Sequence, residues 1–155
     1  MTLQLTLPFI VTTFCQRPGP LESWHPSPQA ASVQPAAVTV FIPMQTHSEN
    51  RYRRQAWQVT AAVTRKQRGY VALALYNHKR QLLQLAEGKV QVILVRVGAR
   101  RLDADNLQGS LKAVRDGVAA QLSLDDSDCR ISWCYEQETT TDRREHGVRI
   151  TISGL

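Results

Sequence analysis

The sequence has little cysteine and no apolar run long enough to cross a bilayer. Its three cysteines, Cys15, Cys129 and Cys134, are odd in number and lack the spacing of zinc ligands. This pattern argues against a disulfide framework and a zinc site, and it favours a reducing compartment. Residues 1–15 are moderately apolar, but they lack a basic start and are too short to span a membrane. We therefore expect no membrane segment and a cytoplasmic location.

Two further absences narrow the choice of enzyme class. The sequence contains neither a glycine-rich phosphate loop nor a Walker sequence, so a different phosphoryl-transfer enzyme, such as a nucleotide hydrolase, has little support. The histidines have no serine or cysteine at a recognisable catalytic spacing: His25, His47, His78 and His146. We expect each of them to be a surface or structural residue.

Positive charge exceeds negative charge. The 155 residues include 19 Lys and Arg against 13 Asp and Glu, and the formal net charge of +6 favours a polyanionic partner. Between positions 51 and 68 the charged side chains are all basic: Arg51, Arg53, Arg54, Arg65, Lys66 and Arg68. We interpret them as phosphate contacts, with an ordinary solvated helix face as the alternative.

The composition changes near residue 38. Residues 1–37 are predicted to be a poorly ordered extension or linker, because prolines between positions 18 and 35 prevent a long helix or a central strand. Residues 38–155 are predicted to be one domain, which begins with a strand at 38–42. Residues 51–75 favour a helix, or two helices divided at Gly69, with Trp57 as core packing.

The remaining pattern indicates a sheet covered by helices. A buried strand at 89–97, with Gln91 and Arg96 as polar exceptions, precedes an acidic motif. The helix that follows has one apolar stripe: Leu107, Leu111, Val114, Val118 and Leu122. Strands at 129–136 and 148–153 should then form an antiparallel pair. This order predicts an α+β fold, with a mixed β-sheet and helices packed on it.

Acidic side chains occur on both sides of the striped helix. Asp103 and Asp105 precede it, and Asp126 follows it within the run from Asp125 to Asp128. Residues two apart point the same way in an extended segment, so the helix should begin at or just after Asp105. With the third carboxylate they could hold one or two Mg²⁺ ions, or Mn²⁺ as a substitute, against a phosphate. A helix N-cap and a solvated turn are the structural alternatives.

Basic side chains accompany this acidic motif. Lys112 falls on the same side of the predicted helix as Asp105, roughly 10 Å further along its axis. It could therefore reach a phosphate beside the metal. A contact between Lys112 and Asp116, one turn apart, is an equally good interpretation. Arg100 and Arg101 come directly before the acidic motif, and we predict that they contact the DNA backbone.

Several short stretches of the sequence resemble a known family. They are Asp103 to Leu107, Lys112 to Asp116, the pair Asp125-Asp126 and, upstream, Ile42-Pro43 with Ser48, Asn50 and Arg51. In this order, residues from about 38 to 152 resemble the RusA-like Holliday junction resolvases of phages and prophages. The acidic pairs are the most specific part of the match.

The resemblance implies a homodimeric, Mg²⁺-dependent endonuclease that resolves four-way DNA junctions in recombination and repair. Asp103, Asp105 and Asp126 would occupy the metal-binding positions, and Lys112 that of the essential lysine. In the family this lysine follows the second aspartate by one helical turn, and here Gly109 holds that position. A catalytically degenerate DNA-binding protein of the same fold is therefore the alternative. The predicted DNA contacts are Asn50, Arg100, Arg101 and the basic residues between positions 51 and 68.

Overall fold

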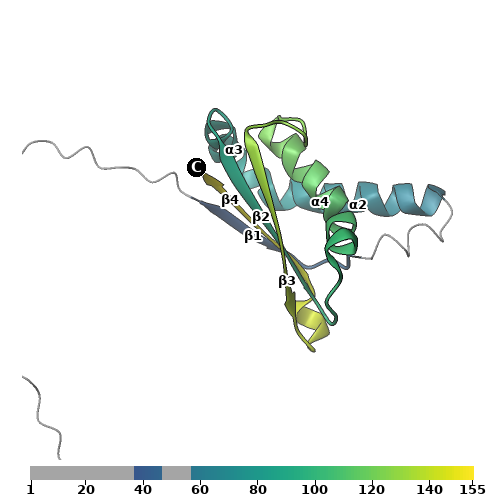
Figure 1. Cartoon of the computed structure of the whole chain (residues 1–155). Helices are drawn as coiled ribbons and strands as arrows, with labels where there is room; N and C mark the ends of the chain where they lie inside the picture. Colours follow the sequence, from purple (N-terminus) through teal and green to yellow (C-terminus); the bar gives the residue numbers. More distant parts are fainter. Residues whose placement is uncertain (1–36, 47–56) are drawn as a thin grey trace, which may run out of the picture. The chain divides into compact units, whose positions relative to one another are not determined.

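The computed structural model describes residues 37–46 and 57–155, and within them the chain has an α+β fold (Figure 1). The elements are β1 (Val38–Ile42), α2 (Trp57–Leu75), η1 (Tyr76–His78), α3 (Lys79–Leu85), β2 (Val90–Gly98), α4 (Ala104–Leu122), β3 (Ile131–Thr139), η2 (Arg143–Glu145) and β4 (Gly147–Gly154). The described strands form one mixed, four-stranded sheet in the order β1-β4-β2-β3. The predicted fold class is therefore confirmed for the described residues.

β2 and β3 are parallel neighbours, and α4 connects them. Parallel strands need such a crossover, because the chain must return to the end at which the first strand began. α4 has 19 residues, which corresponds to about 28 Å of helix. The nine-residue strands β2 and β3 have a similar length, about 30 Å. The beginning of α4 therefore lies near the carboxyl end of β2.

β4 lies inside the sheet and not beside β3. It pairs in antiparallel fashion with β1 and with β2, so the antiparallel pair predicted for the last two strands is wrong. The side chains of Val148, Ile150 and Ile152 are fully buried. A strand with this pattern suits the middle of a sheet, whereas the partly exposed β3 suits an edge.

The core lies between one face of the sheet and the helices. Val92 and Leu94 of β2 are in register with Ile152 and Ile150 of β4, and all four side chains are fully buried. The apolar stripe of α4 is buried in the same cluster, as predicted: Leu107, Leu111, Val114, Val118 and Leu122. α2 and α3 contribute further buried residues: Val71, Leu75, Leu82 and Leu85.

The opposite face of the sheet carries polar contacts between strands. The hydroxyl oxygens of Thr39 and Thr151 lie 3.2 Å apart. Arg149 of β4 donates to both carboxylate oxygens of Glu138 on β3, at 2.8 and 3.0 Å. Successive side chains of a strand point to opposite faces, so these polar residues alternate with the core residues.

The helix predicted up to residue 75 is confirmed as one element within the described residues, because α2 continues through Gly69 without a break. Two other features of the helices differ from the prediction. Trp57 at the first position of α2 is 75% exposed, so the predicted role in the core is wrong. The seven-residue helix α3 was not predicted, because a helix this short depends on the tertiary burial of Leu82 and Leu85. None of the helices in the described ranges has the length and apolar content needed to cross a membrane.

Two glycines differ sharply in their surroundings. A Cβ atom at Gly147 would lie 2.4 Å from Cζ of Phe41 and 2.5 Å from the carbonyl oxygen of Ile42. The oxygen belongs to the backbone of β1, so the two strands would have to move apart. A Cβ atom at Gly69, by contrast, would have nothing within 4 Å.

We predict opposite effects when these glycines are replaced by alanine. Gly147→Ala should lower the free energy of unfolding by about 1–3 kcal/mol, because it overpacks the contact between β1 and β4. Gly69→Ala should raise it by about 0.5–1 kcal/mol, because alanine favours a helix interior. Urea denaturation of both variants measures the two changes, and a shift of the same sign in both would contradict the prediction.

Candidate functional site

The acidic motif begins at the carboxyl end of β2. In the sheet, Ile42 pairs with Val148 and Val97 pairs with Gly147. These pairs place the carboxyl ends of β1, β2 and β3 and the amino end of β4 at the same end of the sheet, the lower end in Figure 1. The turn between β2 and α4 starts there and carries two exposed arginines, Arg100 and Arg101.

The first two acidic residues surround the first helical position of α4. The helix begins at Ala104 and Asp103 is its N-cap, so the prediction that it begins at or after Asp105 is wrong by one residue. Asp103 accepts hydrogen bonds from the backbone N–H of Asn106 at 2.9 Å and from its side-chain amide at 3.0 Å. Asp105 is exposed in the first turn, where the helix dipole favours negative charge. Capping thus accounts structurally for Asp103.

Gln137 of β3 fixes the backbone directly before Asp103. Its side-chain oxygen accepts from the N–H of Leu102 at 2.8 Å, and its side-chain nitrogen donates to the carbonyl of Leu102 at 2.7 Å. The side-chain amide of Gln137 therefore satisfies both the backbone N–H and the backbone carbonyl of Leu102. This paired contact holds the entry to α4 against the sheet.

Asp126 is held at a different place. Its carboxylate forms an ion pair with Arg115 of α4, and Nε of Arg115 donates to it at 3.1 Å. The indole N–H of Trp133 donates to the backbone carbonyl of Asp126 at 3.0 Å. The guanidinium lies 6.0 Å from the ring centre of Trp133, and its Nη1 is 3.5 Å from the hydroxyl of Tyr135. The hydrogen bond to Asp126 raises the pKa of Arg115.

The three predicted metal ligands are therefore not brought together. Arg115 lies about 15 Å further along α4 than Asp105, and Asp126 is bound to Arg115. Carboxylates that share a Mg²⁺ or Ca²⁺ ion must all approach it to within about 2–2.6 Å. In the described part of the chain, no three His, Cys, Asp or Glu side chains are grouped so that they could hold a metal ion.

Lys112 lies in a groove between α2 and α4. This cavity has a volume of about 320 Å³, and Gly109, Lys112 and Asp116 line it from α4. On the α2 side, Arg68 forms an ion pair with Asp116. The predicted contact between Lys112 and Asp116 is not among the ion pairs of the described residues, and Arg68 is the partner of Asp116 instead. Lys112 is exposed.

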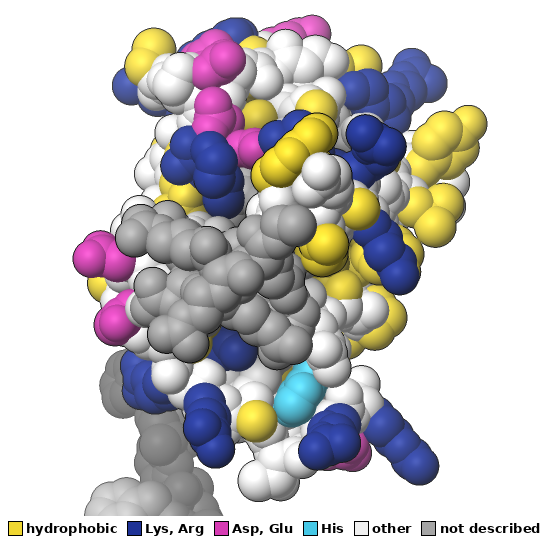
Figure 2. Space-filling view, turned by 90° about the vertical axis from the view of Figure 1, so that its right-hand side faces the viewer, with side chains coloured by type: hydrophobic (Ala, Val, Ile, Leu, Met, Phe, Trp, Pro, Cys, Tyr) yellow, Lys and Arg dark blue, Asp and Glu magenta, His cyan; other side chains and the backbone are white. Residues whose placement is uncertain are grey.

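The predicted DNA contacts are only partly described. Asn50, Arg51, Arg53 and Arg54 lie outside the described residues. The others are exposed: Arg65, Lys66, Arg68, Arg100 and Arg101. Lys66 lies 5.7 Å from the ring centre of Tyr70. Figure 2 shows Lys and Arg side chains at both the upper and the lower end of the face in view, so the positive charge is not gathered into one patch.

A cavity at the carboxyl end of β2 contains residues that the sequence analysis did not select. Its volume is about 460 Å³, and its lining includes Arg96, Arg100 and His146. Arg96 was noted only as a polar exception in a buried strand, and His146 was expected to be structural. The signal that could have indicated a site was an arginine at a core-facing position of β2.

The run from Asp125 to Asp128 is a turn stabilised by its own side chains. Asp125 accepts a hydrogen bond from the backbone N–H of Ser127 at 2.9 Å. Asp128 accepts from the backbone N–H of Arg130 at 2.9 Å and forms an ion pair with its guanidinium at 2.8 Å. These hydrogen bonds to Arg130 lower the pKa of Asp128 to about 2. A turn therefore accounts for Asp125 and Asp128, as the structural alternative predicted.

Comparison with known proteins adds no assignment. No protein-family model matches the sequence, and no curated protein matches it significantly.

The paired contact of Gln137 predicts a local effect on the entry to α4. Gln137→Leu should lower the free energy of unfolding by about 1–3 kcal/mol, because the N–H and carbonyl of Leu102 lose their partner in a partly buried place. Amide hydrogen exchange at Leu102 should become faster. Glu136→Gln, a change on the exposed opposite side of β3, is the control, and equal exchange in both variants would refute the role of Gln137.

The low pKa of Asp128 predicts a pH-dependent contribution to stability. Its ordinary pKa is 3.8 and its folded value is about 2, so the ionised carboxylate stabilises the fold above about pH 4. This stabilisation is lost as the pH falls towards about 2. We expect the Tm of Asp128→Asn to lie below that of the wild type at neutral pH, with a difference that shrinks below about pH 4. A constant Tm difference in thermal denaturation across this range would contradict the linkage.

Proposed function

We propose that this chain is a Mg²⁺-dependent endonuclease that acts on branched DNA such as four-way junctions. The observation that carries the proposal is the position of Asp103 and Asp105. They stand at the first turn of α4, directly after the exposed arginines Arg100 and Arg101. Gln137 fixes the intervening backbone. Carboxylates held next to guanidinium groups suit a metal ion and a phosphate that bind together.

Asp103 and Asp105 are the residues that would hold the ion. Because α4 begins at Ala104, they do not share an extended segment: Asp105 would bind from the first turn, and Asp103 through the oxygen lone pairs that its hydrogen bonds from Asn106 leave free. Mg²⁺ keeps several of its waters and is usually bound by one or two carboxylates together with a substrate phosphate. Two carboxylates fit that pattern, with Mn²⁺ as a substitute, whereas a site that includes Asp126 conflicts with the pairing of Asp126 with Arg115. When bound, the metal would activate water and neutralise charge on the phosphate. Asp126 would instead be a positioning residue that holds Arg115 and Trp133.

The basic side chains would bind the DNA backbone. Arg100 and Arg101 are close in sequence to the carboxylates, and Arg65 and Lys66 are exposed on α2. Lys112 stands roughly 10 Å along α4 from Asp105, so it would contact a neighbouring phosphate. The resemblance to RusA-like resolvases supports a homodimer in the cytoplasm of a bacterial host. Two symmetric sites would suit paired cuts across a two-fold junction.

A second candidate function is DNA binding without cleavage. One observation favours it: the carboxylate of Asp126, at a predicted metal position, is occupied by the guanidinium of Arg115. Gly109 also stands where the resembling family has its lysine. The basic residues would then bind the DNA backbone, and Asp103 would serve only as a helix cap.

The proposal predicts metal-dependent cutting of a synthetic junction. The wild type should cleave a labelled four-way junction with Mg²⁺ or Mn²⁺ and leave a linear duplex of the same sequence intact. Asp105→Asn should reduce the cleavage rate by about 100-fold or more, because it removes a charge that would hold the ion. Junction affinity in EDTA, measured by fluorescence anisotropy, should change little. Glu87→Gln removes one exposed carboxylate elsewhere and should leave cleavage unchanged.

Three outcomes separate the alternatives. Junction binding by the wild type without cleavage in either metal would favour the second candidate. Equal cleavage by wild type and Asp105→Asn would refute the assigned site. For Asp126→Asn we expect a lower Tm with an unchanged Mg²⁺ requirement, as for a positioning residue, whereas an increased Mg²⁺ requirement would make Asp126 a ligand.

A further inference from the structure

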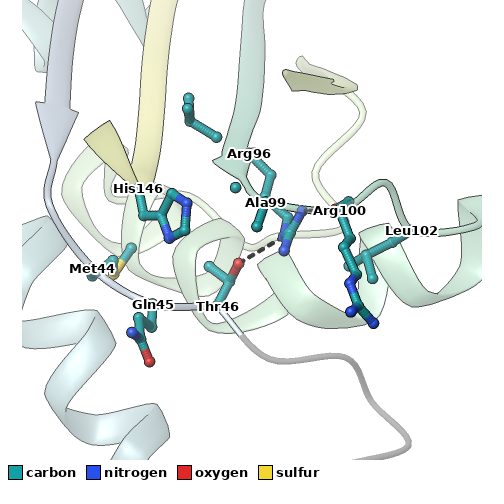
Figure 3. A pocket seen from close by; sticks show the side chains of 10 residues that line it. Met44, Gln45, Thr46, Arg96, Ala99, Arg100, Leu102 and His146 are labelled. Atoms are coloured by element: carbon teal, nitrogen blue, oxygen red, sulfur yellow. Dashed lines mark hydrogen bonds between the residues drawn. The ribbon is translucent and has the colours of Figure 1, made fainter. Parts of the chain in front are cut away.

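The cavity at the carboxyl end of β2 has an unusual lining. Its volume is about 460 Å³, and it is surrounded by Met44, Thr46, Arg96, Arg100, Leu102 and His146 together with neighbouring backbone. No carboxylate is among the residues that line it. Figure 3 shows Arg96 and His146 approaching the space from opposite sides, with Thr46 between them. The cavity thus combines cationic and hydrogen-bonding groups without an internal counter-charge.

Arg96 occupies a position of β2 at which the alternation of core-facing residues predicts an apolar side chain. Along β2 it follows Val92 and Leu94 on the core-facing side, and its partners in register are Gln137 of β3 and Val148 of β4. Burial lowers the pKa of its guanidinium, which still remains charged at neutral pH. Among the residues that the structure describes, Arg96 has no carboxylate partner. Such an arrangement costs desolvation energy with no ion pair to offset it.

The guanidinium of Arg96 is held in one orientation. Its Nε donates to the hydroxyl of Thr46 at 3.0 Å, and its Nη1 donates to the carbonyl of Arg100 at 2.8 Å. It also lies close against the backbone of Gly98, where a Cβ atom would come within 2.9 Å of Nη2. A flexible cation is thereby fixed before any ligand binds, which reduces the entropy cost of binding one.

His146 contributes a second polar group without a partner. Its Nε2 atom is buried and has no hydrogen-bond partner within the described ranges. Buried polar atoms are nearly always hydrogen-bonded, because an unpaired one costs about 1–3 kcal/mol. His146 directly precedes β4, so it lines the cavity from the segment that leads into the strand next to β2.

We propose that this cavity binds a phosphate group, with Arg96 donating hydrogen bonds to its oxygens and Arg100 adding charge at the rim. Nε2 of His146, which is buried at the cavity wall, would donate as well once the ring turns towards the phosphate. A planar guanidinium presents paired donors that match phosphate geometry. The cavity also touches Leu102, the residue that directly precedes the candidate metal carboxylate Asp103. The identification of this phosphate as a DNA phosphate rests on the proposed function. The proposal of an anion site does not depend on that function.

The DNA arm of the test measures binding without metal. In EDTA, Arg96→Gln should weaken junction binding in fluorescence anisotropy by about 10-fold or more. The slope of log affinity against log salt should fall by about 0.9, which corresponds to one lost phosphate contact. Arg149→Gln is the matched control, because it removes the same charge from an arginine that pairs with Glu138 on the opposite face of the sheet. The control should stay within about twofold of the wild type.

The phosphate arm observes the site directly. Inorganic phosphate should shift the ring nitrogen resonances of His146 in NMR spectra of the wild type at constant pH and ionic strength, and chloride should not. The shift should be absent in Arg96→Gln and reduced in Arg96→Lys, which keeps the charge but not the planar pair of donors. Should Arg96→Gln not fold, Arg96→Lys replaces it in both arms, with a reduced His146 shift and weaker junction binding as the readouts. Its retained charge should leave the salt slope unchanged.

The two arms separate the sources of the phosphate. A His146 shift together with weaker junction binding by the Arg96 variant supports the proposal in full. A His146 shift with unchanged junction binding assigns the cavity to a small phosphate-bearing molecule and overturns the DNA source. No shift, together with equal junction binding by the Arg96 and Arg149 variants, overturns the site. Since neither arm requires cleavage, a failed nuclease assay is distinguishable from a failed phosphate site.

Discussion

The attachment of α4 to β3 is the constraint on which the rest of the structure depends. Alternate residues of β3 hold successive parts of α4 and its flanking segments. Gln137 binds the backbone before the helix, Tyr135 lies near Arg115 within it, and Trp133 binds the carbonyl of Asp126 after it. The contacts run in reverse order along the chain because the crossover helix is antiparallel to the strands it joins.

This attachment decides how the acidic residues can act. It places Asp103 and Asp105 at the beginning of a helix about 28 Å long and leaves Asp126 with Arg115, well along its length. Carboxylates that look like one cluster in sequence are thus divided into a pair and a separate ion-paired residue. A pair is enough when the substrate phosphate supplies the other ligands, because Mg²⁺ does not require an all-protein site. Under the proposed function, metal binding would then depend on the presence of DNA.

The local sequence pattern predicted most of the helices and strands, whereas contacts between residues distant in sequence determine how these elements are arranged. The β1 strand and the stripe from Leu107 to Leu122 follow from periodicity, so both were predictable. The insertion of β4 between β1 and β2 was not, because strand pairing depends on partners distant in sequence. The same limit applies to Asp126, whose partner Arg115 lies on the far side of a helix end and a turn. Trp57 was misplaced because a large apolar residue is not always buried.

The position of Arg96 in the sheet, and not its charge alone, indicates a binding site. An arginine on an exposed strand face is ordinary, but Arg96 follows Val92 and Leu94 on the side that packs against the helices. Folding removes part of its guanidinium from water, and Thr46 and the carbonyl of Arg100 replace only some of that hydration. The unpaired Nε2 of His146 in the same cavity adds a second cost of the same kind. The phosphate that we propose for this cavity would offset both costs, whereas an apolar residue at either position would incur none.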